Sequence, residues 1–236
     1  MGRSLAILWS RRGHRVTLVG RGRAVPEADA WILTVPDTRI ADVASQLPPG
    51  PILLHCSGSL PVEVLRPHRP AGSLHPLMTF PGPELGLPEL QGAFAALAGD
   101  PEARALARRL AVELGLEPIE VPGDRRLYHA SAVIAGNLTT VLVGEAARVL
   151  AAAGVPEARA LEMLAPLAEI SARNAAHGVA QALTGPIPRG DDAILEGHRR
   201  ALIEHGFQDL CAVYDTLVRQ ARVCLSARES DKEGEG

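Results

Sequence analysis

The sequence predicts an α/β domain built on a parallel sheet, followed by an all-α domain. Strand-like and helix-like segments alternate through the first part of the chain, which is typical of a parallel sheet with helical crossovers. After Gly123 the segments become long, rich in Ala and Leu, and free of strand patterns. We therefore expect a sheet domain over 1–122, a helical domain over 123–228 and a disordered tail over 229–236, which is charged and Gly-rich.

The first domain should open with a helix over Ser4–Arg12. Apolar residues recur there at helical spacing, and Gly13 stands in the C-cap position. Compact β-rich runs follow, and the expected strands are Arg15–Val19, Ala30–Val35, Pro51–Cys56, Ala93–Ala98 and Glu117–Val121. Further helices are expected at Ile40–Leu47 and Glu102–Leu114. Segment 20–29 is too short for the usual helix and third strand, so we expect a shortened sheet that lacks the third strand.

The second domain should consist of four helical segments. They are expected at Arg125–Ala153, Pro156–Leu183, Asp191–His205 and Phe207–Arg228. Pro166 should kink or split the second segment, because proline lacks an amide donor and its ring clashes with the preceding turn. The apolar faces exceed what one small bundle can bury, so we expect a homodimer formed through this domain.

The start of the chain resembles the later part of a dinucleotide-binding unit. Such a unit needs a strand, a G-x-G-x-x-G turn, a helix whose N-terminus faces the pyrophosphate, and a second strand. Gly2 stands where the third glycine belongs, which makes Gly2 and Arg3 candidate cofactor-binding residues. The first strand and two glycines are missing, so we expect a natural start about ten residues upstream, given usual strand lengths. The alternative is an ordinary helix–strand pair of another α/β fold.

The residues after the expected strand Arg15–Val19 favour NADP over NAD. NAD-specific proteins carry Asp or Glu at this place, whereas this chain has Gly20-Arg21-Gly22-Arg23. An arginine can pair bidentately with a ribose 2′-phosphate, which a carboxylate would repel. We therefore expect a Rossmann-like domain in which Gly20 and Arg21 contact NADP. The alternative is a turn that carries two solvated arginines.

Further motifs carry a resemblance to known proteins. Val35-Pro36-Asp37 after a hydrophobic strand is similar to the segment that follows the nucleotide in pyrroline-carboxylate-reductase-like and 6-phosphogluconate-dehydrogenase-like proteins. The other motifs are His55-Cys56-Ser57-Gly58, Ser73-Leu74-His75-Pro76-Leu77, Leu127-Tyr128-His129-Ala130, Ala135-Gly136-Asn137, and Leu183-Thr184-Gly185-Pro186 with Arg189-Gly190-Asp191. Together they resemble a bacterial family that joins a Rossmann-like NADP-binding domain to a helical domain of unknown function. The resemblance implies an oxidoreductase fold, and it places Val35, Pro36 and Asp37 beside the cofactor.

One departure from related proteins concerns the chemistry. Related hydroxyacid dehydrogenases carry a lysine four residues before an asparagine on the first long helix of the second domain. Here the asparagine is Asn137, but the earlier position is Val133. A lysine acid/base is therefore not available at that place, and an enzyme would need a different proton donor.

Histidines are the candidates for that proton transfer, because their pKa suits acid–base chemistry near neutral pH. His75 follows a short strand at the edge of the sheet where such folds bind ligands. His129 opens the first long helix, and Asn137 shares its face at helical spacing. We expect His75, His129 and Asn137 to be catalytic. The alternatives are a structural His-Pro turn, a structural His129 and an Asn137 that hydrogen-bonds between helices.

Two loops are candidates for ligand contacts. Ser57-Gly58 after a strand can offer backbone amides and a hydroxyl to the nicotinamide or the substrate, or can simply form a turn. In the polar loop 184–192, Arg189 can hold a substrate carboxylate, with Asp191 beside it. The alternative for Arg189 is a surface position in a helix-capping loop.

Composition narrows the classes of partner. The net charge is −3 and the basic residues are scattered, so we expect no nucleic-acid partner. We expect no membrane span either, because no uninterrupted apolar run reaches about 18 residues. Cys56, Cys211 and Cys224 lie far apart without metal-ligand spacing, which favours a reducing cytoplasm and no metal site.

Taken together, these patterns predict an NADP-dependent oxidoreductase that acts on a small carbonyl, imine or hydroxyacid substrate in the cleft between the domains. The rival interpretation is a degenerate or sensing protein that binds NADP without turnover. The missing lysine and the truncated phosphate-binding loop favour the rival, and His75, His129 and Asn137 favour the enzyme.

Overall fold

The computed structural model describes the backbone of residues 1–234 and the side chains of residues 1–227. The chain forms two compact units, Met1–Asn137 and Leu138–Gly236. The division falls later than the expected boundary at 122/123, because the first turns of the helical region pack on the sheet and belong to the first unit.

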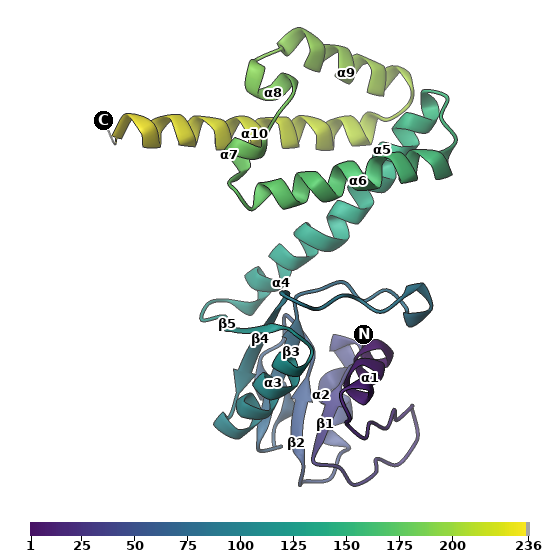
Figure 1. The fold of residues 1–236 in the computed structure, drawn as a ribbon, viewed down its shortest axis with the longest axis vertical. Coiled ribbons are helices and arrows are strands. Elements are labelled where there is room, and N and C mark those ends of the chain that lie inside the picture. The colour runs from purple at the N-terminus through teal and green to yellow at the C-terminus, as the bar shows by residue number, and fades with distance from the viewer. Residues whose placement is uncertain (235–236) are drawn as a thin grey trace. The chain divides into compact units, whose positions relative to one another are not determined.

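A five-stranded sheet organises the first unit (Figure 1). Its strands are β1 (Ala30–Leu33), β2 (Ile52–His55), β3 (Ala71–Pro76), β4 (Phe94–Gly99) and β5 (Glu117–Glu120), and they lie in that order across the sheet. All neighbours are parallel except β3 and β4. No α-helical crossover joins β3 to β4, so the chain can return in the antiparallel direction. The predicted α/β fold is thus confirmed, and the sheet, expected to be parallel, is parallel except for the pair β3–β4.

The expected strand Arg15–Val19 was wrong, because these residues do not join the sheet. Within the described residues β1 is hydrogen-bonded to β2 alone. In a doubly wound sheet another strand separates the one that follows the first helix from the position of β1. Without that neighbour Arg15–Val19 has no ladder to join, and Leu18 is left exposed.

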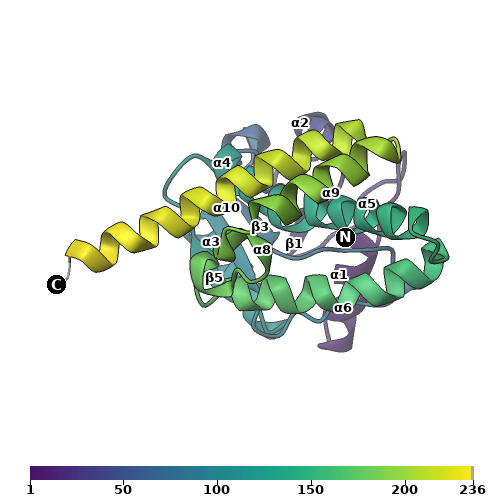
Figure 2. The ribbon, with the colours of Figure 1, turned by 90° about the horizontal axis from the view of Figure 1, so that it is seen from above.

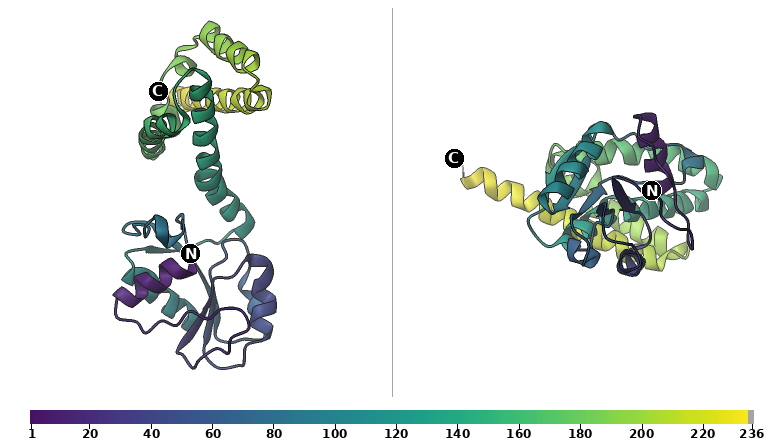
Figure 3. Two further views of the ribbon diagram at one scale, coloured as in Figure 1. Left: turned by 90° about the vertical axis from the view of Figure 1, so that its right-hand side faces the viewer. Right: turned by 90° about the horizontal axis from the view of Figure 1, so that it is seen from below.

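Helices cover both faces of the sheet (Figure 3, left). Helices α1 (Gly2–Arg11) and α3 (Pro101–Glu113) pack on one face, and α2 (Asp37–Ser45) with the 3-10 turn η1 (Val62–Leu65) packs on the other; a second 3-10 turn, η2, spans Pro83–Leu85. Leu53 and Leu54 enter opposite core clusters because successive strand residues point to opposite faces. Trp9 ties α1 to α3 by donating from Nε1 to the Leu110 carbonyl at 3.1 Å. Cys56 is buried in the same cluster as Trp9.

The helical region begins with an interrupted helix. Its elements are α4 (Arg125–Val133), a π-helical segment η3 (Ile134–Leu138), α5 (Thr139–Ala152), α6 (Glu157–Ala175), the short turns α7 (Val179–Ala182) and α8 (Pro186–Arg189), α9 (Asp192–Glu204) and α10 (Gln208–Gly234). Pro166 lies inside α6 without splitting it. Helix α10 runs through 229–234, which were expected in the disordered tail, and residues 235 and 236 lie outside the described part.

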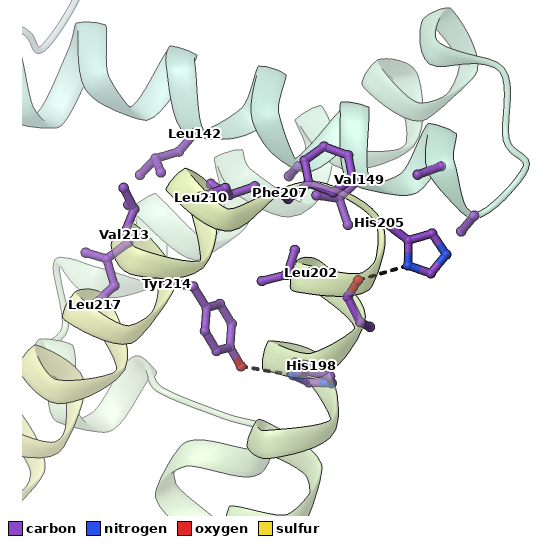
Figure 4. A pocket seen from close by; sticks show the side chains of 14 residues that line it. Leu142, Val149, His198, Leu202, His205, Phe207, Leu210, Val213, Tyr214 and Leu217 are labelled. Carbon is purple, nitrogen blue, oxygen red and sulfur yellow. Dashed lines mark hydrogen bonds between the residues drawn. The ribbon is translucent and has the colours of Figure 1, made fainter.

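The second unit has a thin core. Helix α5 packs along α6, and α9 along α10 (Figure 2). Its buried hydrophobic residues, among those described, are Ala147, Ala160, Leu195, Leu202 and Cys211. An apolar cavity of about 450 Å³ lies between α5, α9 and α10, with Phe207 and Leu210 in its wall (Figure 4). The Tyr214 hydroxyl lies 2.9 Å from Nδ1 of His198 at this cavity.

Candidate functional site

Polar side chains of the first unit gather where β2 and β3 end and α4 begins. Strand β2 ends at His55, β3 carries His75, and the first turns of α4 supply Arg125, Tyr128 and His129. Asp124 begins α4 as its N-cap and accepts a hydrogen bond from the Arg126 amide at 2.8 Å. The carboxyl ends of parallel strands are where ligands bind in such sheets.

Asp37 and Ser57 hold two predicted segments together. The Asp37 carboxylate accepts hydrogen bonds from the Ser57 hydroxyl at 2.6 Å and the Ser59 hydroxyl at 2.9 Å. Ser57 Oγ in turn accepts from the Leu60 amide at 3.0 Å. Val35-Pro36-Asp37 and Ser57-Gly58, proposed separately as cofactor contacts, are therefore one structure. Asp37 sets the shape of the loop that carries Ser57.

His55 is a buried, neutral imidazole that sequence reasoning passed over. Its Nδ1 accepts a hydrogen bond from the Ser57 amide at 3.1 Å, so the ring proton resides on Nε2. Burial, reinforced by the charge of Arg125 and opposed by Asp37, lowers the pKa of His55 to about 4. His55 ends an apolar strand, where a histidine gives no periodic signal, so only its place in the quoted motif could have marked it.

His75 lies at the centre of the cluster. Its Nδ1 is 2.8 Å from the Tyr128 hydroxyl, and its ring meets those of Tyr128 and His129 edge-on, with centroids 5.5 and 6.1 Å away. Burial, with smaller contributions from His129 and Arg125, lowers the pKa of His75 to about 4. Burial also raises the pKa of the Tyr128 phenol, which therefore keeps its proton at neutral pH.

Gly58 brings the two predicted histidines together. A Cβ atom on Gly58 would lie 2.8 Å from His75 Nε2 and 2.8 Å from His129 Cδ2. Both rings thus rest against the Gly58 backbone, and no side chain fits there. The structure places Ser57, Gly58, His75 and His129 in one cluster.

Arg125 completes the cluster and was also missed from the sequence. Its Nη2 donates to the Ser57 carbonyl at 3.2 Å, and its guanidinium carbon lies 6.0 Å from the centroid of the Tyr128 ring. Burial lowers the pKa of Arg125, which stays charged at neutral pH. Tyr128 lies in the same sequence motif as His129, but only His129 was predicted to be catalytic, because imidazoles titrate near neutrality.

The residues expected at the nucleotide lie at the neighbouring strand. A side chain at Gly2 would collide with Thr34, just beyond β1, so the start of α1 approaches the end of that strand closely. This contact suits the third glycine of a dinucleotide turn, whose role is close helix–strand packing. Arg3 lies 3.7 Å from Glu84, and both are largely exposed. Gly20 and Arg21 stand in an exposed segment outside the sheet.

Three other predicted residues are not part of the cluster. Asn137 is exposed within η3. The π-helical turn holds more residues than an α-turn, so the α-helical spacing from His129 does not extend through it. In the second unit Arg189 Nε lies 2.8 Å from Asp191 Oδ2, and both side chains are substantially exposed.

Comparison with known proteins gives the family. The sequence profile described as "Domain of unknown function (DUF2520)" matches residues 93–221, more than half of the chain. The chain belongs to the DUF2520 family. The match includes His129 and Tyr128 but begins after β1, β2 and β3. A comparison of the DUF2520 chain with curated proteins found no significant match.

Solved structures share the fold of this DUF2520 protein. Protein TM1727 from Thermotoga maritima is 27% identical, with a TM-score of 0.69 over 88% of this chain and 82% of that one. BF3122 from Bacteroides fragilis, an NADP oxidoreductase by provisional assignment, is 23% identical, with a TM-score of 0.70 over 84% and 76%. The 1-pyrroline-5-carboxylate reductase of Streptococcus pyogenes is 18% identical, with a TM-score of 0.55 over 83% and 76%. These similarities confirm the Rossmann-like fold and the predicted resemblance.

Proposed function

We propose that this DUF2520 protein is a nicotinamide-dependent oxidoreductase that uses NADP to reduce or oxidise a small carbonyl, imine or hydroxyacid substrate. The observation that carries the proposal is the cluster of His75, Tyr128 and His129 one strand away from the residues that suit the nucleotide. The solved neighbours, one provisionally described as an NADP oxidoreductase and one described as a 1-pyrroline-5-carboxylate reductase, support this reaction class.

The residues present suit a dinucleotide on its phosphate and nicotinamide sides. Gly2 allows the N-terminus of α1 to approach the end of β1, where backbone amides would face a phosphate. Val35, Pro36 and the Ser57-Gly58 backbone would lie beside the nicotinamide, and Arg3 or Arg21 would meet the ribose phosphate. Bound there, the cofactor supplies or accepts the hydride.

The protein must then move one proton, and the phenol of Tyr128 is the best donor. It keeps its proton at neutral pH, and its hydroxyl is held by His75 Nδ1. His75 is neutral and can shuttle the proton back after each turnover. His129 lies against the same glycine backbone and can contact the substrate. Tyr128 would thus take the acid/base role of the lysine that related hydroxyacid dehydrogenases carry at the position of Val133.

A second candidate is binding of NADP without turnover. Val133 in place of lysine favours it, and so does the packing of His75 Nε2 against Gly58, which leaves little room for substrate at that nitrogen. The two functions differ in turnover alone.

Fluorescence titration with NADPH and NADH, followed by NADPH oxidation assays against 2-oxo acids, cyclic imines and aldehydes, tests both. We expect NADPH to bind more tightly than NADH, Arg21→Gln to remove that preference, and one substrate class to be reduced. Binding without oxidation of any substrate would establish the second candidate. Absence of nucleotide binding would refute both.

We also propose that the second unit pairs with a second copy of the chain. Large apolar side chains on its helices stay exposed, including Leu167 at 63% and Val213 at 43%, while most of its buried hydrophobic residues are small. Exposed apolar surface that is contiguous commonly marks a protein–protein interface on a soluble protein. Pairing two copies would cover the cavity in Figure 4 and complete the thin core.

A bilayer is the other way to cover such a face. By length and composition alone, the stretch Arg125–Ala152 could span a membrane, since it contains an 18-residue window with a mean hydropathy of 1.4. Its first turn, however, contacts the sheet unit through Arg125 and Tyr128. Glu145 and Arg148 form an ion pair near its other end. The apolar segment left between them is too short, so we propose a soluble, cytoplasmic protein.

A further inference from the structure

Arg125 is a half-buried cation without an anionic partner. Among the described residues its one hydrogen-bond acceptor is the Ser57 carbonyl, and its Nε is buried with no partner. The next residue, Arg126, shows the contrast, because its Nε and Nη2 both bind the Asp124 carboxylate at 2.7–3.1 Å while the side chain is largely exposed. Of these two adjacent arginines, the exposed one is paired with a carboxylate and the half-buried one is not.

The groups around Arg125 do not neutralise its charge. His55 and His75 are neutral at pH 7, and Tyr128 keeps its proton. Asp37 is the nearby carboxylate that acts on both histidines, but its hydrogen bonds go to the Ser57 and Ser59 hydroxyls. Partly burying a guanidinium is costly unless an anion accompanies it. The cluster is therefore suited to an anionic ligand.

We propose that Arg125 binds the carboxylate of the substrate, so that the substrate is a 2-oxo acid, an imino acid or the corresponding hydroxy or amino acid. The inference rests on the proposed function. A planar guanidinium fork matches a carboxylate with two parallel hydrogen bonds. Reduction then adds a hydride to the carbon next to the carboxylate and a proton from Tyr128 to its oxygen or nitrogen. The products are the hydroxy or amino acid and the oxidised cofactor.

The cofactor phosphates are a less suitable source of the anion. They belong at the N-terminus of α1, beside the end of β1, where Gly2 meets Thr34. Arg125 instead lies next to Ser57, beyond the end of β2, and stacks on Tyr128. A carboxylate held there would place the adjoining carbon near the proposed proton donor.

The test measures binding separately from turnover. The arginine Nε–H signals of the 15N-labelled full-length protein are followed by NMR during titration with lactate, and with lactamide as the neutral analogue of the same shape. Arg125→Gln, Arg125→Lys and the matched control Arg126→Gln are titrated alongside, and NADPH affinity is measured for each. Trp9 and Trp31, the two tryptophans of the chain, both lie in the sheet unit, so their fluorescence reports whether each variant is folded.

We expect saturable millimolar binding of lactate, a shift of the Arg125 Nε signal, and no binding of lactamide. Arg125→Gln should weaken lactate binding about 10-fold to 100-fold, Arg125→Lys should restore part of it, and Arg126→Gln should leave it unchanged. Equal binding of lactate and lactamide, no binding of lactate, or unaltered binding by folded Arg125→Gln would overturn the inference. If Arg125→Gln lost NADPH binding but kept lactate binding, the arginine would belong to the nucleotide site and the inference would be overturned. If the wild-type protein bound lactate but not NADPH, the anion site would stand and the proposed function would be refuted.

Discussion

The Tyr128 hydroxyl and His75 Nδ1, 2.8 Å apart, join the first turn of α4 to strand β3. The pair unites two motifs that are more than fifty residues apart in the chain, and it places a protonated phenol against a neutral imidazole. The cofactor transfers the hydride and the protein must transfer the proton. We therefore expect substitutions at this pair to have the largest effect on the proposed reaction.

Replacing Tyr128 by Phe should lower kcat about 100-fold or more while leaving NADPH affinity unchanged, because the ring stays and only the proton donor is lost. Steady-state kinetics with the best substrate, together with an NADPH titration, measure both quantities. Tyr214→Phe is the matched control, since Tyr214 makes an equivalent contact with His198 in the second unit. If the Tyr128 and Tyr214 variants reduce kcat equally, Tyr128 is not the proton donor.

The sheet unit should lose stability as the pH falls from about 6.5 to about 4. In this window the unfolded chain binds protons at His55 and His75, whereas their folded pKa values near 4 keep both rings neutral. The unfolded state therefore binds more protons, and the free energy of unfolding decreases with falling pH, by roughly 3 kcal/mol for each histidine across the window.

Urea unfolding followed by tryptophan fluorescence at several pH values measures this dependence, because both tryptophans lie in the sheet unit. His75→Gln should flatten the slope by about half, and the exposed His177→Gln should leave it as in the wild type. A wild-type stability that does not change over this range would contradict the buried neutral state of both rings.

Gly58→Ala should destabilise the sheet unit by about 1–3 kcal/mol, because the added methyl group meets both His75 and His129. The proposed activity should fall as well, since the two rings must move apart. Urea unfolding and kinetics on the same sample check the two effects. The control is Gly123→Ala, where a Cβ meets no neighbour. Equal stability of the two variants would show that the rings adapt without cost.

Light scattering at micromolar concentration and without detergent should give twice the mass of the chain. Leu217→Glu, which adds a charge at the apolar cavity, should shift the protein towards the monomer. Leu85→Glu changes an equally apolar but strongly exposed residue of the sheet unit and should leave the mass unchanged. A monomeric wild type would refute the pairing of the second units.

Local pattern was sufficient where secondary structure depends on neighbours in the chain. The strands at Ala30–Val35 and Pro51–Cys56 and the helix at Glu102–Leu114 lie within a few residues of β1, β2 and α3. Arg15–Val19 failed for a nonlocal reason, since a strand needs a hydrogen-bonding neighbour as well as apolar residues.

The cluster could be predicted only in part. The sequence pointed to His75, His129, Ser57 and Gly58, which the structure brings together. It did not point to Arg125, whose lack of a carboxylate partner is a property of its three-dimensional surroundings. Asn137 was expected to share a helix face with His129, but η3 interrupts the α-helical periodicity on which that expectation depends.

Each unit contains a buried cysteine whose labelling rate can report how often that unit opens. Cys56 is enclosed in the sheet unit, where burial raises the pKa of its thiol to about 12, and Cys211 is buried in the helical unit. A thiol reagent can reach either one only while the surrounding unit is open. In a variant that lacks Cys224, the two labelling rates would time the opening of the sheet unit and of the helical unit within a single sample.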